Sequence, residues 1–185
     1  MDTPKVLISV LNWNNFISTS RTINSIKQLS YVDYELIIID NNSTDHSINK
    51  IHEYYPEFKV LKNTSNLGYA GGHKKSLDYL YNNKFDLLWI INNDIIVNDN
   101  TLSELVESFK KNGEGLYGSL ILDQSFIIQF SGGNELKNDF IDFYKSNIYF
   151  GKLYHDVVNQ FMNLFVVHGR KVDSANIAID PDHRR

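Results

Sequence analysis

The sequence lacks cysteine, has no excess of positive charge and contains no long apolar run. The missing cysteines exclude disulfide bonds and thiolate metal sites. A net charge of −4 provides no broad basic surface, so we expect no nucleic-acid partner. The apolar runs are shorter than the roughly 20 residues that a membrane-spanning helix needs, and the first is too short for a signal peptide. We therefore expect a cytoplasmic protein.

Several catalytic motifs are also missing. The six histidines show neither H-x-x-x-H nor H-E-x-x-H spacing, which argues against a zinc site. The G-x-S-x-G elbow of serine hydrolases does not occur. The glycines match neither the Walker pattern nor G-x-G-x-x-G. The sequence thus excludes the commonest hydrolase and mononucleotide motifs.

Short apolar runs predict buried strands at residues 6–11, 36–39 and 87–91, with a weaker strand at 58–61. Runs of this length without polar alternation are typical of parallel strands that are covered on both faces. At 185 residues, of which 42% are apolar, the chain is long enough for one α/β domain.

Apolar residues repeat at helical spacing in residues 48–55, 77–81 and 101–109, which predicts helices between or after the strands. Thr101 and Glu104 have the spacing of a capping box at the start of the last helix. Alternation of strands and helices predicts βαβ units and a mostly parallel sheet. After Gly113 the alternation of strand and helix patterns becomes less regular. Further strand or turn candidates are residues 116–122, 126–130, 131–134, 139–150, 161–167 and 172–179.

Four polar clusters lie where predicted strands lead into helices. They are residues 12–15, 40–45, 66–72 and 92–94, all rich in Asn, Asp or Gly. In open α/β sheets, ligands bind at the carboxyl ends of the strands. Because three clusters directly follow an apolar run, the sequence predicts one ligand site formed by loops that are far apart in the chain.

The cluster at 40–45 contains a carboxylate and two amides just after a buried strand. Asp40 and Asn41 have the donors and acceptors to recognise a base edge or ribose hydroxyls. The alternative is a helix cap with an Asx-turn, and for Asp45 we favour that structural role.

The glycine segment has Gly68, Gly71 and Gly72 ahead of a helix. Glycine lets the backbone approach a ligand, and a helix N-terminus favours phosphate. The alternative is a tight turn. His73 and the two lysines after it are candidate diphosphate contacts, although charged residues in a first helical turn are usually solvated.

Asp94 is the candidate metal ligand. Mg²⁺ and Mn²⁺ take oxygen ligands, often one or two carboxylates with the rest from water and phosphates. The alternative is a turn cap, which is disfavoured because other polar residues lie closer to the next helix.

Trp13 and Trp89 are expected in the core, with a stacking role as the alternative for Trp13.

In this order, the clusters resemble family 2 glycosyltransferases, especially the rhamnosyltransferase-like members of bacterial polysaccharide assembly. The matching segments are VLNWNN, IIIDNNSTDHS, NLGYAGG and WIINNDIIV, within residues 5–111. The resemblance implies a GT-A, Rossmann-like α/β fold, a nucleoside-diphosphate sugar as donor, inversion at the anomeric carbon and a divalent cation, Mg²⁺ or Mn²⁺.

The resemblance also implies roles for individual residues. Asp40 and Asn41 would contact the nucleoside beside the backbone of Leu11 and Asn12. Residues 68–72 would lie near base and ribose. Asn92, Asn93 and Asp94 stand at the family's D-x-D-type metal motif, where only Asp94 keeps the carboxylate and Asn92 is left to bind ribose or to use its carbonyl.

Two departures from the family pattern affect activity. His73 to Ser76 replace Asn residues and a further Gly. The family's general base is an Asp or Glu beyond an S-G-A-type segment, which residues 172–177 resemble only faintly. Asp180 and Asp182 are not convincing bases, so the base is unassigned.

We therefore expect residues 1–112 to bind the donor and residues 113–185 to form a short or truncated acceptor-side region. The expected activity is hexosyl transfer to a glycan or lipid-linked acceptor, which would bring the protein to the inner membrane face. A shortened half would expose apolar surface and favour a homo-oligomer. The alternatives are a truncated, non-catalytic nucleotide-sugar-binding domain and an interaction scaffold without a ligand.

Overall fold

The computed structural model describes residues 3–113, 115–119, 121–122, 128–130 and 163–167. The candidate segments at 131–134, 139–150 and 172–179 lie outside the described residues, and so do Asp180 and Asp182.

A mixed sheet of six strands forms the centre, in the order β3-β2-β1-β4-β8-β5. The strands are β1 (Val6–Asn12), β2 (Tyr34–Asp40), β3 (Lys59–Lys62), β4 (Leu87–Asn92), β5 (Leu116–Tyr117) and β8 (Asn163–Val167). The first four in this order are parallel, and β8 runs antiparallel to both of its neighbours. The predicted α/β fold with a mostly parallel sheet is confirmed.

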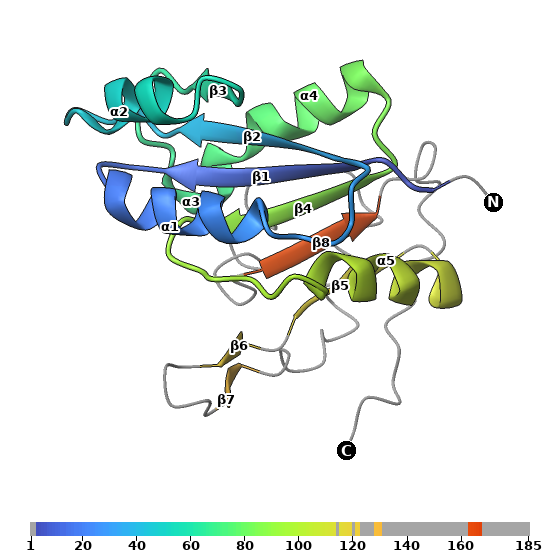
Figure 1. Cartoon of the computed structure of the whole chain (residues 1–185). Helices are drawn as coiled ribbons and strands as arrows, with labels where there is room; N and C mark the ends of the chain where they lie inside the picture. Colours follow the sequence, from blue (N-terminus) through green and yellow to red (C-terminus); the bar gives the residue numbers. More distant parts are fainter. Residues whose placement is uncertain (1–2, 114, 120, 123–127, 131–162, 168–185) are drawn as a thin grey trace.

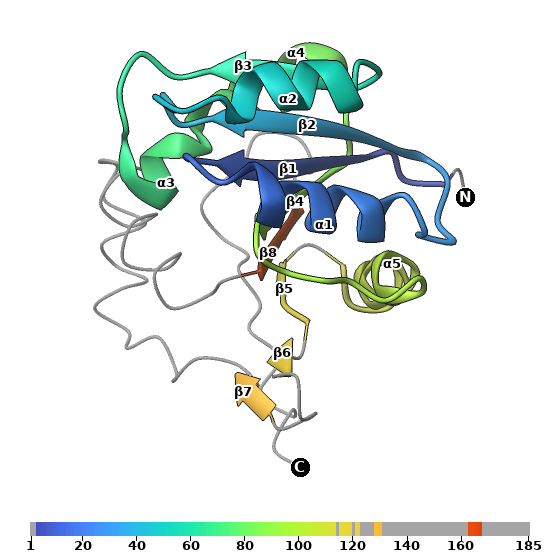
Figure 2. The same cartoon turned by 60° about the vertical axis from the view of Figure 1, so that its left-hand side comes forward.

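Helices cover both faces of this sheet. They are α1 (Phe16–Ile26), α2 (Ser47–Tyr54), α3 (Gly68–Gly72), α4 (Lys74–Asn83) and α5 (Thr101–Asn112). The buried apolar residues of α1, α2 and α5 pack into one hydrophobic cluster, and Leu80 of α4 packs into a second. Figures 1 and 2 show α1 and α4 on opposite faces of the sheet. In the described part of the chain, no helix has the length and apolar character needed to cross a bilayer.

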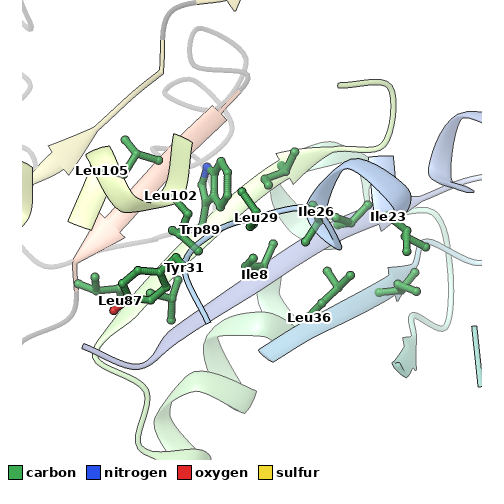
Figure 3. Packing of buried hydrophobic residues seen from close by; sticks show 14 of the residues in the cluster. Ile8, Ile23, Ile26, Leu29, Tyr31, Leu36, Leu87, Trp89, Leu102 and Leu105 are labelled. Carbon is green, nitrogen blue, oxygen red and sulfur yellow. The ribbon is translucent and has the colours of Figure 1, made fainter. Parts of the chain in front are cut away.

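Alternation along β1 divides its side chains between the two clusters. Val6, Ile8 and Val10 face α1 and α5, whereas Leu7 and Leu11 face α4. Figure 3 shows the first cluster, with side chains of α1 and α5 directed at the strands. Each large apolar side chain that is removed from water contributes about 1.5–3 kcal/mol to stability. This two-sided burial explains why the strands lack polar alternation.

Helix α1 was not predicted. Its buried face includes Thr19 and Thr22 beside Ile23 and Ile26, so the apolar stripe is too polar to stand out. The side chain of Asn15 caps this helix and accepts a hydrogen bond from the Ser18 amide at 3.2 Å.

The capping box predicted for α5 is wrong. Asn100 is the N-cap residue and its side chain makes no capping bond. Glu104 instead accepts a hydrogen bond from the Asn100 side-chain amide at 2.5 Å. The apolar stripe located this helix correctly.

The single strand predicted at 116–122 is divided in the structure. β5 ends at Tyr117, and β6 (Ile121–Leu122) pairs with β7 (Ile128–Phe130) in a separate two-stranded sheet.

Candidate functional site

The ends of the parallel strands bring the predicted clusters to one place. In the sheet register Asn12 lies opposite Asp40, and Leu11 lies opposite Asn92. Helix α3 lies beyond the ends of β1 and β2 in Figure 2, and its Gly72 packs against Leu11 of β1. We call the four segments 11–15, 40–45, 66–73 and 92–94 the carboxyl edge.

Asn12 ties the first two loops of the carboxyl edge together. It is fully buried. Its side-chain NH₂ donates to the hydroxyls of Ser43 at 3.0 Å and Ser47 at 3.1 Å, and its carbonyl accepts from Thr19 at 2.8 Å. Its main-chain carbonyl accepts the Asn41 amide at 2.8 Å. Asn12 therefore uses its polar groups on the protein and sets the spacing between the two loops.

Asp40 has two carboxylate oxygens in different surroundings. Its Oδ1 accepts a hydrogen bond from the Ser43 amide at 3.0 Å. Its Oδ2 is buried and has no hydrogen-bond partner among the described residues. The exposed Lys62 ammonium lies 3.9 Å from this oxygen, too far for a hydrogen bond. Because buried polar oxygens are normally hydrogen-bonded, Oδ2 is suited to a donor from a ligand.

Asn41 uses its whole side-chain amide to hold the segment that leads into α3. Its NH₂ donates to the Asn66 side chain at 2.8 Å and to the Gly68 carbonyl at 3.0 Å. Its carbonyl accepts from Asn63 and from the Leu67 amide, both at 3.1 Å. Asn41 thus connects the end of β2 to the glycine segment by side-chain hydrogen bonds.

The glycine segment forms a short helix of its own, α3, and is not the expected loop ahead of a helix. Gly68 begins it with a φ of +69°, a conformation that glycine adopts without strain. A Cβ on Gly72 would lie 2.7 Å from Leu11 Cδ1, and one on Gly71 would lie 3.0 Å from Leu67 Cβ. At Gly72 the missing side chain therefore allows close packing of α3 on β1.

The predicted diphosphate contact of His73 is wrong. His73 is fully buried beneath the sheet, with Nδ1 2.8 Å from the Ser9 hydroxyl, which lies 2.7 Å from that of Ser76. Burial lowers the pKa of His73 to about 3, so the imidazole is neutral. The ammonium of Lys75 donates to the carbonyl of Lys62, and only Lys74 among these candidates is exposed.

The segment after β4 carries the candidate metal ligand. Asp94 is exposed, and Asn92 is the last residue of the strand. Asn93 donates to the hydroxyl of Thr19 in α1 at 2.9 Å, and that hydroxyl also binds Asn12 at the end of β1. The described residues contain no group of three or more His, Asp or Glu side chains around one point. A single carboxylate still fits a cation whose other ligands are phosphate oxygens and water.

Asp45 has the structural role that we favoured. Its carboxylate accepts from the amide and the hydroxyl of Ser47, at the start of α2. Burial raises the pKa of Asp45, but these hydrogen bonds outweigh that effect, so the pKa lies below its usual value.

The two tryptophans differ in their environment. Trp89 is a core residue, as expected. The core position expected for Trp13 is wrong, because the chain leaves the sheet after Asn12 and Trp13 is 53% exposed on the carboxyl edge.

The residues that the sequence did not reveal are those that hold the loops in place. Thr19, Ser47 and Asn63 are buried polar residues whose side chains bind loop residues. Polar residues on the otherwise apolar face of a helix, such as Thr19 in α1, are the sequence signal that could have identified them.

A hollow of about 750 Å³ lies at the opposite end of the sheet, near the start of β2 and β3. Polar side chains that line it are paired with each other or with the main chain. Lys27 lies 2.9 Å from Glu57, the Tyr79 hydroxyl donates to Glu35 at 2.6 Å, and that of Tyr34 donates to the Ile26 carbonyl. The buried Asp40 oxygen, which has no hydrogen bond from a described group, therefore favours the carboxyl edge over this hollow as the ligand site.

Known proteins resemble this chain in sequence and in fold. Residues 7–167 match the family described as Glycosyl transferase family 2. No curated protein matches the chain. Among solved structures, one that is similar is the mannosyltransferase PcManGT from Pyrobaculum calidifontis in complex with GDP-Man and Mn²⁺. It matches with a TM-score of 0.56 and 18% identity, and the match covers 66% of this chain and 37% of that one.

A second similar structure is S. aureus TarS 1-349, with a TM-score of 0.51 and 19% identity over 60% of this chain and 34% of that one. The same protein in complex with UDP-GlcNAc matches with a TM-score of 0.53, 16% identity and 71% coverage of this chain, against 37% of its own. At these identities the likeness shows the fold, which is GT-A. The chain spans about a third of the length of these two proteins.

Proposed function

Because the chain belongs to glycosyl transferase family 2, we propose that it binds a nucleoside-diphosphate sugar at the carboxyl edge and transfers its hexosyl group. The proposed acceptor is a glycan or a lipid-linked glycan in polysaccharide assembly, and the proposed outcome is inversion at the anomeric carbon. The observation that carries the proposal is the buried Asp40 Oδ2, which no described group hydrogen-bonds, at the edge where the four polar segments meet.

The nucleoside end of the donor is assigned to Asp40. A base N–H or a ribose hydroxyl would donate to Oδ2 and satisfy an oxygen that otherwise costs about 1–3 kcal/mol to bury. Trp13 presents an exposed indole on the same edge, and an aromatic face is suited to stack on a base. Asn41 acts indirectly in this proposal, because its amide is occupied in holding α3.

The diphosphate end is assigned to the segment with Asp94. Its exposed carboxylate would hold Mg²⁺ or Mn²⁺ together with the donor's phosphate oxygens, and the carbonyl of Asn92 is a second candidate ligand. When bound, the cation offsets the charge that develops on the departing nucleoside diphosphate. Oxygen ligands of this kind suit Mn²⁺. The similar Pyrobaculum structure is a complex with GDP-Man and Mn²⁺.

The transfer step requires a group that removes the proton of the attacking acceptor hydroxyl. The family resemblance places this base on the acceptor side, and we assign it to no described residue. The proposal for the described residues is therefore confined to the donor half, with residues 113–185 proposed as the acceptor side.

Calorimetry tests donor binding. UDP, dTDP and GDP are titrated into the chain with and without Mn²⁺, and we expect binding of at least one of them, strengthened by the metal. Asp94→Ala should abolish the strengthening, while Asp99→Ala, an exposed carboxylate farther along the same segment, should keep it. Absence of binding to all three would leave only the scaffold interpretation.

Product analysis then separates an enzyme from a binding domain. The chain is incubated with the sugar derivative of the nucleotide that binds, with and without a lipid-linked glycan acceptor. Transfer or hydrolysis of the donor supports the proposed activity. Binding without either reaction supports a non-catalytic nucleotide-sugar-binding domain.

A further inference from the structure

Trp13 lies between two residues that are held to the loop after β2. On one side, the buried side chain of Asn12 donates to the hydroxyls of Ser43 and Ser47. On the other side, Asn14 binds the same loop through its main chain and its side chain. The indole of Trp13 is nevertheless 53% exposed. Its main chain is therefore fixed from both sides, while its ring stays open to a ligand.

Asn14 makes four hydrogen bonds to the loop after β2. Its main-chain N–H donates to the Ser43 hydroxyl at 3.0 Å. Its side-chain oxygen accepts from the main-chain amides of Thr44 at 2.8 Å and Asp45 at 3.3 Å. Its side-chain NH₂ donates to the Thr44 hydroxyl at 3.5 Å, the longest of the four. A single side chain thus joins the two loops that flank the buried carboxylate of Asp40.

The main chain of Asn14 turns sharply directly after Trp13. Its φ is +50°, in the left-handed region, which asparagine adopts more readily than most other residues. The hydrogen bonds of its side chain hold this turn against the loop after β2. Because Trp13 is ordered before a ligand arrives, a base that stacks on its indole loses less conformational entropy on binding.

We infer that Asn14 is a positioning residue, whose side-chain bonds to Thr44 and Asp45 hold Trp13 ready to stack on the nucleobase of the donor. Asn14 itself touches no ligand, since its side-chain oxygen is occupied by two main-chain amides. The inference rests on the proposed function, because it needs a nucleotide at the carboxyl edge.

Calorimetry on the full chain, with the nucleoside diphosphate that binds best, measures the effect of Asn14. Asn14→Gly permits the same left-handed turn and removes the side-chain bonds. It should weaken binding by roughly 5- to 30-fold, the cost of ordering the main chain of one residue. Asn14→Asp keeps the accepting oxygen and should restore most of the affinity.

Lys84→Gly is the matched control for the introduction of glycine. Lys84 is also exposed and left-handed, with a φ of +57°, but it follows α4 ahead of β4, at the other end of the sheet. Its substitution should leave nucleotide affinity unchanged. An equal loss of affinity in Lys84→Gly and Asn14→Gly would overturn the inference.

A double-mutant cycle with Trp13 separates positioning from a general structural role. In a Trp13→Ala background, Asn14→Gly should cause no further loss of nucleotide affinity, because no indole remains to be held. The same loss in both backgrounds would overturn the inference. Unchanged affinity of Asn14→Gly in the otherwise unmodified chain would also overturn it.

Fluorescence anisotropy decay measures the mobility of the indole without any ligand. The chain has two tryptophans, and Trp89 is buried, so the Trp13→Phe variant gives the contribution of Trp89. Asn14→Gly should make the Trp13 indole more mobile, whereas Asn14→Asp should not. Equal mobility in all three proteins would overturn the inference. Failure of the unmodified chain to bind any nucleotide would overturn the proposed function, and the inference with it, even where the anisotropy shows that Asn14 holds the indole.

Discussion

At the residue scale, the two oxygens of Asp40 separate a structural role from a binding role. Oδ1 holds the Ser43 amide, whereas Oδ2 has no hydrogen-bond partner among the described side chains and main-chain groups. Asparagine preserves the first contact and replaces the second oxygen with an NH₂ group, which cannot accept a hydrogen bond. This single exchange therefore tests the assigned nucleoside contact with little change in shape.

We expect Asp40→Asn to weaken nucleoside-diphosphate binding by roughly 10- to 100-fold, because hydrogen bonds to charged groups contribute about 1.5–3 kcal/mol. Calorimetry gives the affinity, and thermal unfolding should show a similar midpoint for both proteins. Asp45→Asn is the matched control, since the Asp45 carboxylate accepts from the Ser47 amide at the start of α2 and has no assigned ligand contact. Equal affinities of Asp40→Asn and the unmodified chain would contradict the assignment.

His73 provides a residue-scale test of burial. Its pKa is about 3 in the folded chain, below the ordinary value of 6.5. The stability that its neutral form contributes is complete above pH 6.5. As the pH falls from 6.5 towards 3, the unfolded chain binds a proton that the folded chain does not, so stability is lost.

We expect this loss to be about 1.4 kcal/mol for each pH unit in that range. His73→Gln should reduce the slope of stability against pH, measured by chemical denaturation at several pH values. His52→Gln, at an exposed position on α2, is the control. An unchanged slope in His73→Gln would show that the imidazole is not buried as described.

At the scale of elements, α3 depends on Asn41 more than on its own five residues. The Asn41 side chain makes four hydrogen bonds, to Asn63, Asn66, Leu67 and Gly68. Asn41→Ala should lower the free energy of unfolding by about 1–3 kcal/mol, because these hydrogen bonds are lost and the buried Asn63 side chain loses one of its partners.

Hydrogen exchange measures the local effect of this change. Amides in residues 66–72 should exchange faster in Asn41→Ala, whereas those of α5 should be unaffected. Asn83→Ala removes an exposed bond to the Tyr79 carbonyl within α4 and is the matched control. Unchanged exchange in 66–72 would mean that α3 is held by other contacts.

The helices and strands show which parts of the fold can be predicted from the sequence alone. Continuous apolar runs identified β1, β2 and β4 within one or two residues, because strands buried on both faces leave no other pattern. Helix α1 escaped because Thr19 and Thr22 interrupt its buried face. The register that brings Asn12 opposite Asp40 depends on long-range pairing, which no local pattern encodes.

The candidate site was predictable in location but less so in detail. Polar clusters after strands identified the carboxyl edge correctly, since parallel strands end on the same side of a sheet. The sequence did not reveal that Asn12 and Asn41 use their amides on neighbouring loops. It also did not reveal that His73 points into the core, because a histidine after glycines is equally suited to a phosphate site.

At the scale of the whole molecule, the proposed function requires that the four segments of the carboxyl edge form a single donor site. The chain has a candidate alternative in the hollow at the other end of the sheet, lined by Lys27, Tyr34 and Glu57. The two locations share no residues, so a ligand that protects one of them leaves the other unchanged.

Hydrogen exchange with and without a nucleoside diphosphate and Mn²⁺ tests this claim most directly. We expect slower exchange in 11–15, 40–45, 66–73 and 92–94 together, at nucleotide concentrations that saturate the calorimetric signal. Peptides around Lys27 and Glu57 should exchange as before. Protection confined to that hollow, or no protection at the carboxyl edge when nucleotide is bound, would contradict the account.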